Sequence, residues 1–379
     1  MKFSTFVVKI VSPCNLNCSY CYEYNALDDS WKNKPKFMSV DVARQVAKRI
    51  KEHLLPFEPV SVSIVFHGGE PLMLKPAPFS NLIKIFRDEL GPEITPLFGM
   101  QTNGLLINDQ FIDIFNKEDL SVGVSCDGPP SINDKFRINH EGKGSGQKLE
   151  KALLRLQSEK CFKNILSVID TFADPIEVYD YISQFQPRVI DFLLPHGTYD
   201  LPPPRKETFE SEIYADWLIK IFDKWFLSSE GRIKIRMFEE IIENLFGGEG
   251  ALESLGLKPV TLLIISSDGA YEGVDTLKVV SPGEHVLDMN AFTHSLDEAS
   301  EHPKVTMRQL GESGLCEKCS KCSLKNACGG GYLPHRYSKV NGFANPSVYC
   351  ADLFKLINHI DITVKQYIRE KKNTPSYAD

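Results

Sequence analysis

Hydrophobic positions in the first half of the chain follow two alternating periods. Between residues 3 and 195, short runs rich in Val, Ile, Leu and Phe alternate with longer amphipathic stretches. This alternation predicts a parallel sheet whose strands are covered by helices on both faces. The expected strands are 4–11, 60–66, 95–101, 120–126, 163–170 and 188–194, and the expected helices are 40–54, 78–90, 108–117, 146–160 and 175–185.

Six βα units are too few for a closed eight-stranded barrel, so we expect an α/β fold with an open, partial (β/α)6 barrel. The active site of such a fold lies at the carboxyl ends of its strands. The alternation stops at Pro202-Pro203-Pro204, and a β-hairpin is expected within 260–285 around Ser267-Asp268-Gly269. We divide the chain into a barrel core (1–205), a helical bridge (206–258, with two helices in 207–247), a cysteine-rich region (259–351) and a C-terminal helix and tail (352–379).

Composition is that of an ordinary globular protein, with 42% hydrophobic and 25% charged residues among 379. The net charge of −7 gives no electrostatic reason to expect a nucleic acid or an anionic membrane as partner. No apolar run is long enough to span a bilayer, and the N-terminus lacks the pattern of a cleaved signal peptide. We therefore expect a cytoplasmic protein.

Ten cysteines in a reducing compartment are expected to bind metal rather than to form disulfides. Three of them lie within residues 14–21 and five within 316–350. Cys126 and Cys161 stand apart from both groups, and we expect them to be buried packing residues.

The first group, Cys14-Asn-Leu-Asn-Cys18-Ser-Tyr-Cys21, directly follows the first predicted strand. A cubane iron–sulfur cluster normally takes four cysteines, so three leave one iron open for an exchangeable ligand. Zinc is the alternative, but it requires a fourth ligand that the adjoining residues do not supply. The spacing therefore favours a catalytic 4Fe–4S cluster.

This spacing, with the aromatic Tyr20 just before the third cysteine, resembles the defining motif of the radical S-adenosylmethionine (AdoMet) superfamily. The resemblance implies that the open iron chelates the amino and carboxylate groups of AdoMet. It also implies reductive cleavage of AdoMet to a 5′-deoxyadenosyl radical, with the electron supplied by an external reductant of the flavodoxin or ferredoxin type. The cofactor would then perform the most difficult chemistry.

Three more segments at predicted strand ends, residues 67–71, 101–104 and 125–129, resemble AdoMet-binding segments of that superfamily. His67-Gly68-Gly69-Glu70-Pro71 resembles the segment that binds the AdoMet amino group, and Arg137 is suited to pair with the carboxylate. Taken alone, such sequences are typical of turns, so their position at the strand ends carries the interpretation. The expected cofactor residues are Tyr20, Gly68, Gly69, Glu70, Pro71, Gln101, Asn103, Ser125, Asp127 and Arg137.

The second group, Cys319-x2-Cys322-x5-Cys328 with Cys350, supplies four thiolates that can close a cubane or hold zinc. Its spacing resembles the auxiliary-cluster half of the SPASM extension of radical AdoMet enzymes, which implies an auxiliary 4Fe–4S cluster on these four residues. Tyr332 and Val274 stand where that extension places cysteines of a further auxiliary cluster. We therefore do not expect the further cluster, and Cys316 has no assigned role.

Residues 24–31, 192–197, 329–337 and 345–350 resemble the Fxs-type and XYE-type SPASM maturases. These act on ribosomally made precursor peptides, and several relatives form three-residue cyclophanes. The implied reaction joins an aromatic ring carbon to the β-carbon of a nearby residue, with the auxiliary cluster accepting the electron released on rearomatisation.

Ring deprotonation requires a base, and Asp275 occupies the position where sulfatase-maturating relatives place a catalytic aspartate. The other interpretation of Asp275 is a solvated hairpin carboxylate. Two alternative functions remain: a formylglycine-generating sulfatase maturase, which normally has both auxiliary clusters, and a non-catalytic iron–sulfur or zinc protein. The GGEP segment argues against the second alternative, because a passive cluster needs no AdoMet site.

Overall fold

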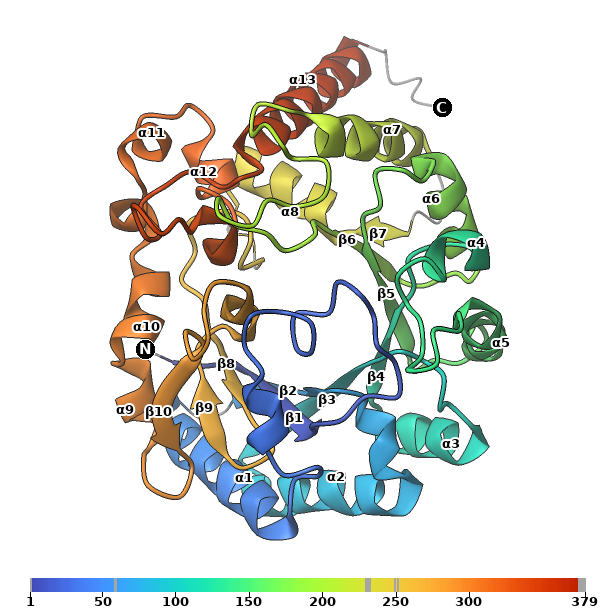
Figure 1. The fold of residues 1–379 in the computed structure, drawn as a ribbon, viewed down its shortest axis with the longest axis vertical. Coiled ribbons are helices and arrows are strands. Elements are labelled where there is room, and N and C mark those ends of the chain that lie inside the picture. The colour runs from blue at the N-terminus through green and yellow to red at the C-terminus, as the bar shows by residue number, and fades with distance from the viewer. Residues whose placement is uncertain (1, 58–59, 229–232, 249, 251, 374–379) are drawn as a thin grey trace, which may run out of the picture.

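The fold is built on a curved sheet, seen in a computed structural model that describes residues 2–57, 60–228, 233–248, 250 and 252–373 (Figure 1). Within these residues the sheet has ten strands in the order β10-β9-β8-β1-β2-β3-β4-β5-β6-β7. Its central strands run parallel and pair in chain order. They are β1 (Thr5–Val11), β2 (Val60–Gly68), β3 (Ile94–Thr102), β4 (Ser121–Ser125), β5 (Phe162–Val168) and β6 (Val189–Leu193). All six predicted strands are confirmed.

Helices lie along the outside of the curved sheet, as an open barrel requires (Figure 1). The helix after β1 begins where the sequence predicts it, because the Ser39 side chain accepts a hydrogen bond of 3.2 Å from the backbone N–H of Val42. These helices are α1 (Val40–Leu54), α2 (Pro76–Leu90), α3 (Asp109–Lys117), α4 (Pro130–Asn133), α5 (Gly146–Leu156), α6 (Pro175–Ser183), α7 (Ile213–Leu227) and α8 (Arg236–Leu245). The partial α/β barrel is therefore confirmed.

The predicted hairpin forms, but it does not stand apart from the barrel. Strand β8 (Leu262–Ile265) pairs in parallel with β1, and β9 (Ala270–Glu272) and β10 (Val286–Asn290) extend the same sheet in antiparallel fashion. At the other edge, β7 (Lys234–Ile235) pairs with β6. The β8–β1 pairing brings the segment around Asp275 beside the loop that carries the first cysteines.

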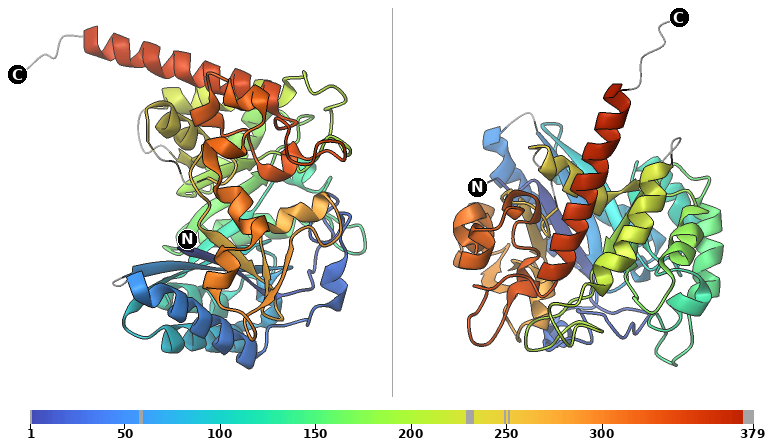
Figure 2. Two further views of the ribbon diagram at one scale, coloured as in Figure 1. Left: turned by 90° about the vertical axis from the view of Figure 1, so that its left-hand side faces the viewer. Right: turned by 90° about the horizontal axis from the view of Figure 1, so that it is seen from above.

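The cysteine-rich region consists of short helices that lead into one long helix. That helix, α13 (Cys350–Asn373), packs against α7 and α8, and its C-terminal part projects beyond the rest of the molecule (Figure 2). The short α-helices are α9 (Leu296–Ser300), α10 (Pro303–Thr306), α11 (Glu317–Ser320) and α12 (Lys325–Cys328). The 3-10 helices along the chain are η1 (Ser30–Asn33), η2 (Leu55–Phe57), η3 (Pro71–Leu74), η4 (Asp275–Val279), η5 (Met307–Gln309), η6 (Gly311–Gly314) and η7 (Leu333–Arg336).

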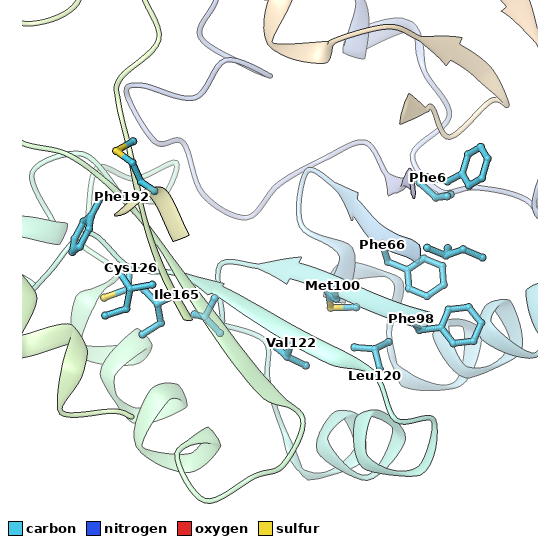
Figure 3. Close-up of a cluster of buried hydrophobic side chains, with 14 of the residues drawn as sticks. Phe6, Phe66, Phe98, Met100, Leu120, Val122, Cys126, Ile165 and Phe192 are labelled. Atoms are coloured by element: carbon cyan, nitrogen blue, oxygen red, sulfur yellow. The ribbon is translucent and has the colours of Figure 1, made fainter. Parts of the chain in front are cut away.

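Buried aromatic side chains hold the helices onto the sheet (Figure 3). Phe66 on β2 packs against Phe79 and Phe86 of α2, with ring centroids 5.4 and 5.8 Å apart. Cys126 and Cys161 are also buried, so their predicted role in packing is confirmed. Among the described residues, no helix is both long enough and apolar enough to cross a membrane.

Candidate active site

A cavity of about 820 Å³ lies inside the barrel, and it extends from the carboxyl ends of the central strands to the amino ends of β1 and β8, where Thr5 and Leu262 line it. It is lined by all three cysteines of the first group and by most of the cofactor residues that the sequence predicts. These are Cys14, Cys18, Cys21, Tyr20, Gly68, Gly69, Gln101, Asn103, Ser125, Asp127 and Arg137. The lining does not include Glu70, Pro71 or Asp275.

The cysteine loop that follows β1 is fixed by backbone hydrogen bonds. The N–H of Asn17 donates to the carbonyl of Ile138 at 2.7 Å, and the N–H of Cys21 donates to the carbonyl of Cys18 at 3.0 Å. Burial, assisted by the neighbouring thiols of Cys18 and Cys21, raises the pKa of Cys14 to about 12. A thiolate in this position requires a metal cation to replace its proton.

Two glycines at the end of β2 let the cysteine loop approach closely. Gly68 has a φ of +124°, and a Cβ atom there would overlap the carbonyl of Val11. A Cβ atom on Gly69 would overlap the carbonyl of Pro13, and the Gly69 N–H donates to the carbonyl of Val11 at 2.8 Å. Larger residues would therefore push the cysteine loop away from β2.

Glu70 is buried behind the cavity wall. Its carboxylate accepts hydrogen bonds from the N–H of Leu72 (3.0 Å), the Thr102 hydroxyl (2.6 Å) and the N–H of Asn103 (2.8 Å). Burial raises the pKa of Glu70, although these hydrogen bonds oppose the shift. Glu70 thus positions Asn103, which lines the cavity. The next residue, Pro71, is the first residue of η3.

Tyr20, Asp127 and Arg137 form a buried chain of hydrogen bonds. Arg137 Nη1 donates to the Tyr20 hydroxyl at 2.7 Å, and that hydroxyl donates to Asp127 Oδ2 at 2.5 Å. Within the described residues, Arg137 Nε is buried without a hydrogen-bond partner. A guanidinium with a free donor at the cavity wall fits an anionic group such as the AdoMet carboxylate.

Asp275 lies in a buried ionic cluster that sequence reasoning did not find. Lys9 Nζ lies 2.8 Å from Glu272 Oε2, 3.1 Å from Glu23 Oε2 and 3.3 Å from Asp275 Oδ2. Lys278 Nζ also contacts Glu23 Oε1 at 2.6 Å. The available signal was Lys9 itself, a charged residue within a strand that is otherwise buried on both faces.

The environment of Asp275 is not that of a solvated hairpin carboxylate, because only 7% of the residue is exposed. Burial opposes ionisation, yet Lys9 holds the pKa of Asp275 below its ordinary value. The Tyr22 hydroxyl donates to Asp275 Oδ2 at 3.0 Å, and Tyr22, His67 and Thr276 line the cavity next to it. The structure therefore places Asp275 one residue behind the cavity wall, in ionised form.

The structure gathers all five C-terminal cysteines, including Cys316. Burial, together with a hydrogen bond with Cys316, raises the pKa of Cys319 to about 12. Electrostatic interactions join Cys319 to Cys328 and Cys350, and join both of those to Cys322. In the described part of the chain, no group of three or more His, Cys, Asp or Glu side chains is spaced to hold a single metal ion.

The two positions that lack the expected cysteines lie together. Val274 belongs to a small apolar cluster with Leu277 and Val280, and Tyr332 packs against that cluster. The Tyr332 hydroxyl also lies 2.6 Å from Thr276 Oγ1. Apolar packing and a hydroxyl pair thus fill the place between β9 and η7.

Comparisons with known proteins agree with this arrangement. The profile of the Radical SAM superfamily matches residues 8–182. A cysteine-type anaerobic sulfatase-maturating enzyme of Clostridium perfringens is 24% identical over 89% of this chain and 91% of its own length. A serine-type anaerobic sulfatase-maturating enzyme of Bacteroides thetaiotaomicron is 25% identical over 92% of this chain and 86% of its own length.

Solved structures show the same fold. Native anSMEcpe with bound AdoMet superposes with a TM-score of 0.82 at 23% identity and covers 97% of this chain and 99% of its own. Streptococcus suis SuiB bound to the precursor peptide SuiA gives a TM-score of 0.56 at 15% identity, covering 88% of this chain and 72% of its own. The superfamily uses AdoMet and a 4Fe–4S cluster. Residues 8–182, which carry the three-cysteine loop and the cavity wall around it, therefore belong to the radical SAM superfamily.

Proposed function

We propose that this chain is a radical AdoMet enzyme that oxidises one residue of a peptide substrate at its β-carbon. The observation that carries the proposal is the single cavity that unites Cys14, Cys18 and Cys21 with Arg137 and with the neighbours of Asp275. The volume of about 820 Å³ is large enough for a nucleoside cofactor together with a substrate side chain.

The residues present fit the cofactors. Cys14, Cys18 and Cys21 would hold the cluster, Arg137 would pair with the AdoMet carboxylate, and Gly68 and Gly69 would keep the cysteine loop seated on β2. When bound, the cluster and AdoMet supply a radical that abstracts hydrogen from the substrate. The chain itself orients the cofactor, excludes water and holds a carboxylate, Asp275, to receive a proton.

The C-terminal cysteines would hold a second, closed 4Fe–4S cluster on Cys319, Cys322, Cys328 and Cys350. Burial raises the pKa of Cys319 and of Cys328, so their thiolates require a metal centre in place of their protons. Four cysteines suit zinc or a closed cluster equally well by count. The resemblance of their spacing to the SPASM extension favours the cluster.

A peptide substrate is supported by the relatives. Native anSMEcpe has been solved with AdoMet and the Cp18Cys peptide, and SuiB with its precursor peptide SuiA. The electron needed to begin each reaction would come from an external one-electron reductant of the flavodoxin or ferredoxin type.

For the product, we propose a C–C crosslink between an aromatic ring and a β-carbon of a ribosomally made precursor peptide. Support comes from Val274 and Tyr332, which replace cysteines expected in sulfatase-maturating enzymes and lie in one apolar cluster. The second candidate is formylglycine formation, which the names of the relatives favour. Both reactions begin with abstraction of a β-hydrogen and remove two electrons from the substrate.

Product analysis tests this proposal. The precursor peptide, identified from the small reading frame beside the gene, is incubated anaerobically with enzyme, AdoMet and reductant. A crosslink lowers the peptide mass by about two daltons, and deuterium from the attacked β-carbon appears in 5′-deoxyadenosine. Formylglycine formed from serine gives the same mass change, so reaction with hydrazine is used to distinguish the two products. The carbonyl of formylglycine reacts with hydrazine, whereas a C–C crosslink does not. A hydrazine-reactive product would replace the crosslink with the second candidate, and absence of any deuterium transfer would contradict both.

A further inference from the structure

Part of the cavity wall lies outside the residues that the sequence assigns to the cofactors. It comes from the end of β6, from residues 252–262 before β8, and from Tyr332 and His335 around η7. Its aliphatic members include Leu193, Leu252 and Val260. This part of the wall is therefore predominantly apolar, unlike the part that carries Asp127 and Arg137.

Four rings in this region form a continuous surface, which we call the aromatic wall: Tyr22, His196, Tyr332 and His335. The Tyr22 and His196 rings meet edge to face with centroids 5.4 Å apart, and the His196 and Tyr332 centroids are 6.0 Å apart. Tyr332 meets His335 edge to face at 5.4 Å. All four residues line the cavity.

The rings of the wall are fixed in place. His196 Nδ1 lies 3.4 Å from His335 Nε2, so the two imidazoles hold each other, and Tyr332 is held by Thr276 at 2.6 Å. Burial lowers the pKa of His196 to about 4, so its imidazole is neutral at neutral pH. The wall thus presents rigid, uncharged rings to the cavity.

The charged side chains near this part of the cavity are already paired. Arg236 Nη2 lies 2.7 Å from Asp191 Oδ2, and Glu253 Oε1 lies 2.8 Å from Arg308 Nη2. Lys258 also has an interaction partner. Because Arg236 and Asp191 neutralise each other, as do Arg308 and Glu253, these two ion pairs do not favour a charged substrate side chain at the wall.

We propose that the aromatic wall binds an aromatic side chain of the substrate. Rigid rings favour an added ring through edge-to-face contacts, beyond the gain from apolar burial. The wall also adjoins the base: Tyr22 donates to Asp275, and Thr276, which holds Tyr332, is the next residue along η4. A bound ring would lie against Tyr22, whose hydroxyl donates to the carboxylate that is to receive the ring proton. This inference rests on the proposed peptide-modifying function.

The test measures binding of two small probes to the reconstituted enzyme with AdoMet bound. N-acetyl-phenylalaninamide and N-acetyl-cyclohexylalaninamide have similar size, but only the first has an aromatic face. Equilibrium dialysis should show roughly fivefold tighter binding of the phenylalanine probe, the difference expected for one good ring contact. Equal binding of the two probes by the unmodified enzyme would overturn the proposal.

Variants locate the preference. Tyr332→Leu and His196→Leu should abolish it, Tyr332→Phe should retain it, and Tyr367→Leu, which removes a ring on α13 outside the cavity, should leave it unchanged. A preference that persists in both Leu variants of the wall would overturn the assignment to this surface. Reductive AdoMet cleavage is measured in parallel without peptide. Loss of cleavage in the unmodified enzyme would contradict the proposed function, whereas cleavage without an aromatic preference contradicts the wall alone.

Discussion

The Tyr22 hydroxyl donates a hydrogen bond of 3.0 Å to Oδ2 of Asp275. This contact ties the residue that follows Cys21 to the first residue of η4, across 253 positions of the chain. Tyr22 lines the cavity and Asp275 lies behind it. In the proposed reaction, a proton leaving the substrate would pass by way of Tyr22 to a buried carboxylate whose pKa Lys9 lowers.

Asp275→Asn tests this route. The variant removes the proton acceptor but leaves the cysteine loop intact, so AdoMet cleavage and β-hydrogen abstraction should persist. The yield of modified peptide should fall by roughly 10²- to 10⁴-fold, the usual contribution of a general base. The assay follows 5′-deoxyadenosine and product together, with Asp88→Asn on the exposed face of α2 as the matched control. Full modification by the Asp275 variant would assign deprotonation to another base or to water.

Lys9→Met should destabilise the protein most at high pH. In the native protein the pKa values of Asp275 and Glu272 are lowered, so their stabilising effect is present above their ordinary pKa near 4 and is lost as pH falls below it. Without Lys9, burial raises the pKa of these carboxyls. They then become protonated as pH falls, and the cost in free energy of burying their negative charge decreases.

Thermal unfolding at pH 8, 6.5 and 5 measures the effect of Lys9→Met. At pH 8 the free energy of unfolding of the variant should be about 3 to 5 kcal/mol below that of the unmodified protein, as for a broken buried ion pair. This difference should be smaller at pH 5. Lys84→Met, which removes an exposed partner of Asp88, serves as the control and should show little change. A deficit that grows toward pH 5 would contradict the assigned charges.

Gly69→Ala should displace the cysteine loop, because the added Cβ atom would overlap the carbonyl of Pro13 and the hydroxyl of Tyr24. Gly99→Ala on β3 is the matched control, since its Cβ atom would meet ordinary contacts at 3.7 Å. We expect the Gly69 variant to lose iron from the first cluster. Its free energy of unfolding should be lower by at least about 2 kcal/mol, in line with overpacking of a close contact. Equal iron content in the two variants would show that close approach at Gly69 is not required.

The sequence was sufficient for the barrel and for one part of the cavity wall. Motifs at strand ends indicated that Cys14, Gly68 and Asn103 lie near one another, because parallel strands bring their carboxyl ends to the same edge of the sheet. The hydrogen bond that the buried Glu70 carboxylate accepts from Asn103 was not predicted, and the role of its segment in AdoMet binding stays a prediction.

The remaining features depend on contacts between distant segments, which periodicity does not reveal. The pairing of β8 with β1 sets the position of Asp275, and the Lys9 cluster follows from that pairing. The aromatic wall likewise joins Tyr22, His196 and Tyr332 from three separate segments. The strands β7 and β10 were not predicted either, because two and five residues are too few to show a clear alternation of hydrophobic and polar positions.

Iron content tests the number of clusters. Anaerobic reconstitution should give close to eight iron and eight sulfide per chain, which is four for each of two clusters. Cys328→Ala combined with Cys350→Ala should reduce both values to about four, because two thiolates cannot close the auxiliary site. About twelve iron would show that Val274 and Tyr332 do not prevent a third cluster, and stoichiometric zinc at the C-terminal site would favour the zinc alternative.

The central claim is that Cys14, Cys18 and Cys21 hold the cluster that cleaves AdoMet, and its most direct test is 5′-deoxyadenosine formation by the triple Cys→Ala variant. The reconstituted variant is incubated anaerobically with AdoMet and dithionite beside the unmodified enzyme. The unmodified enzyme should form 5′-deoxyadenosine. The variant should form none, while its C-terminal cluster keeps the absorption and EPR spectrum expected of four bound iron atoms. Reductive cleavage of AdoMet by the triple variant would contradict the account.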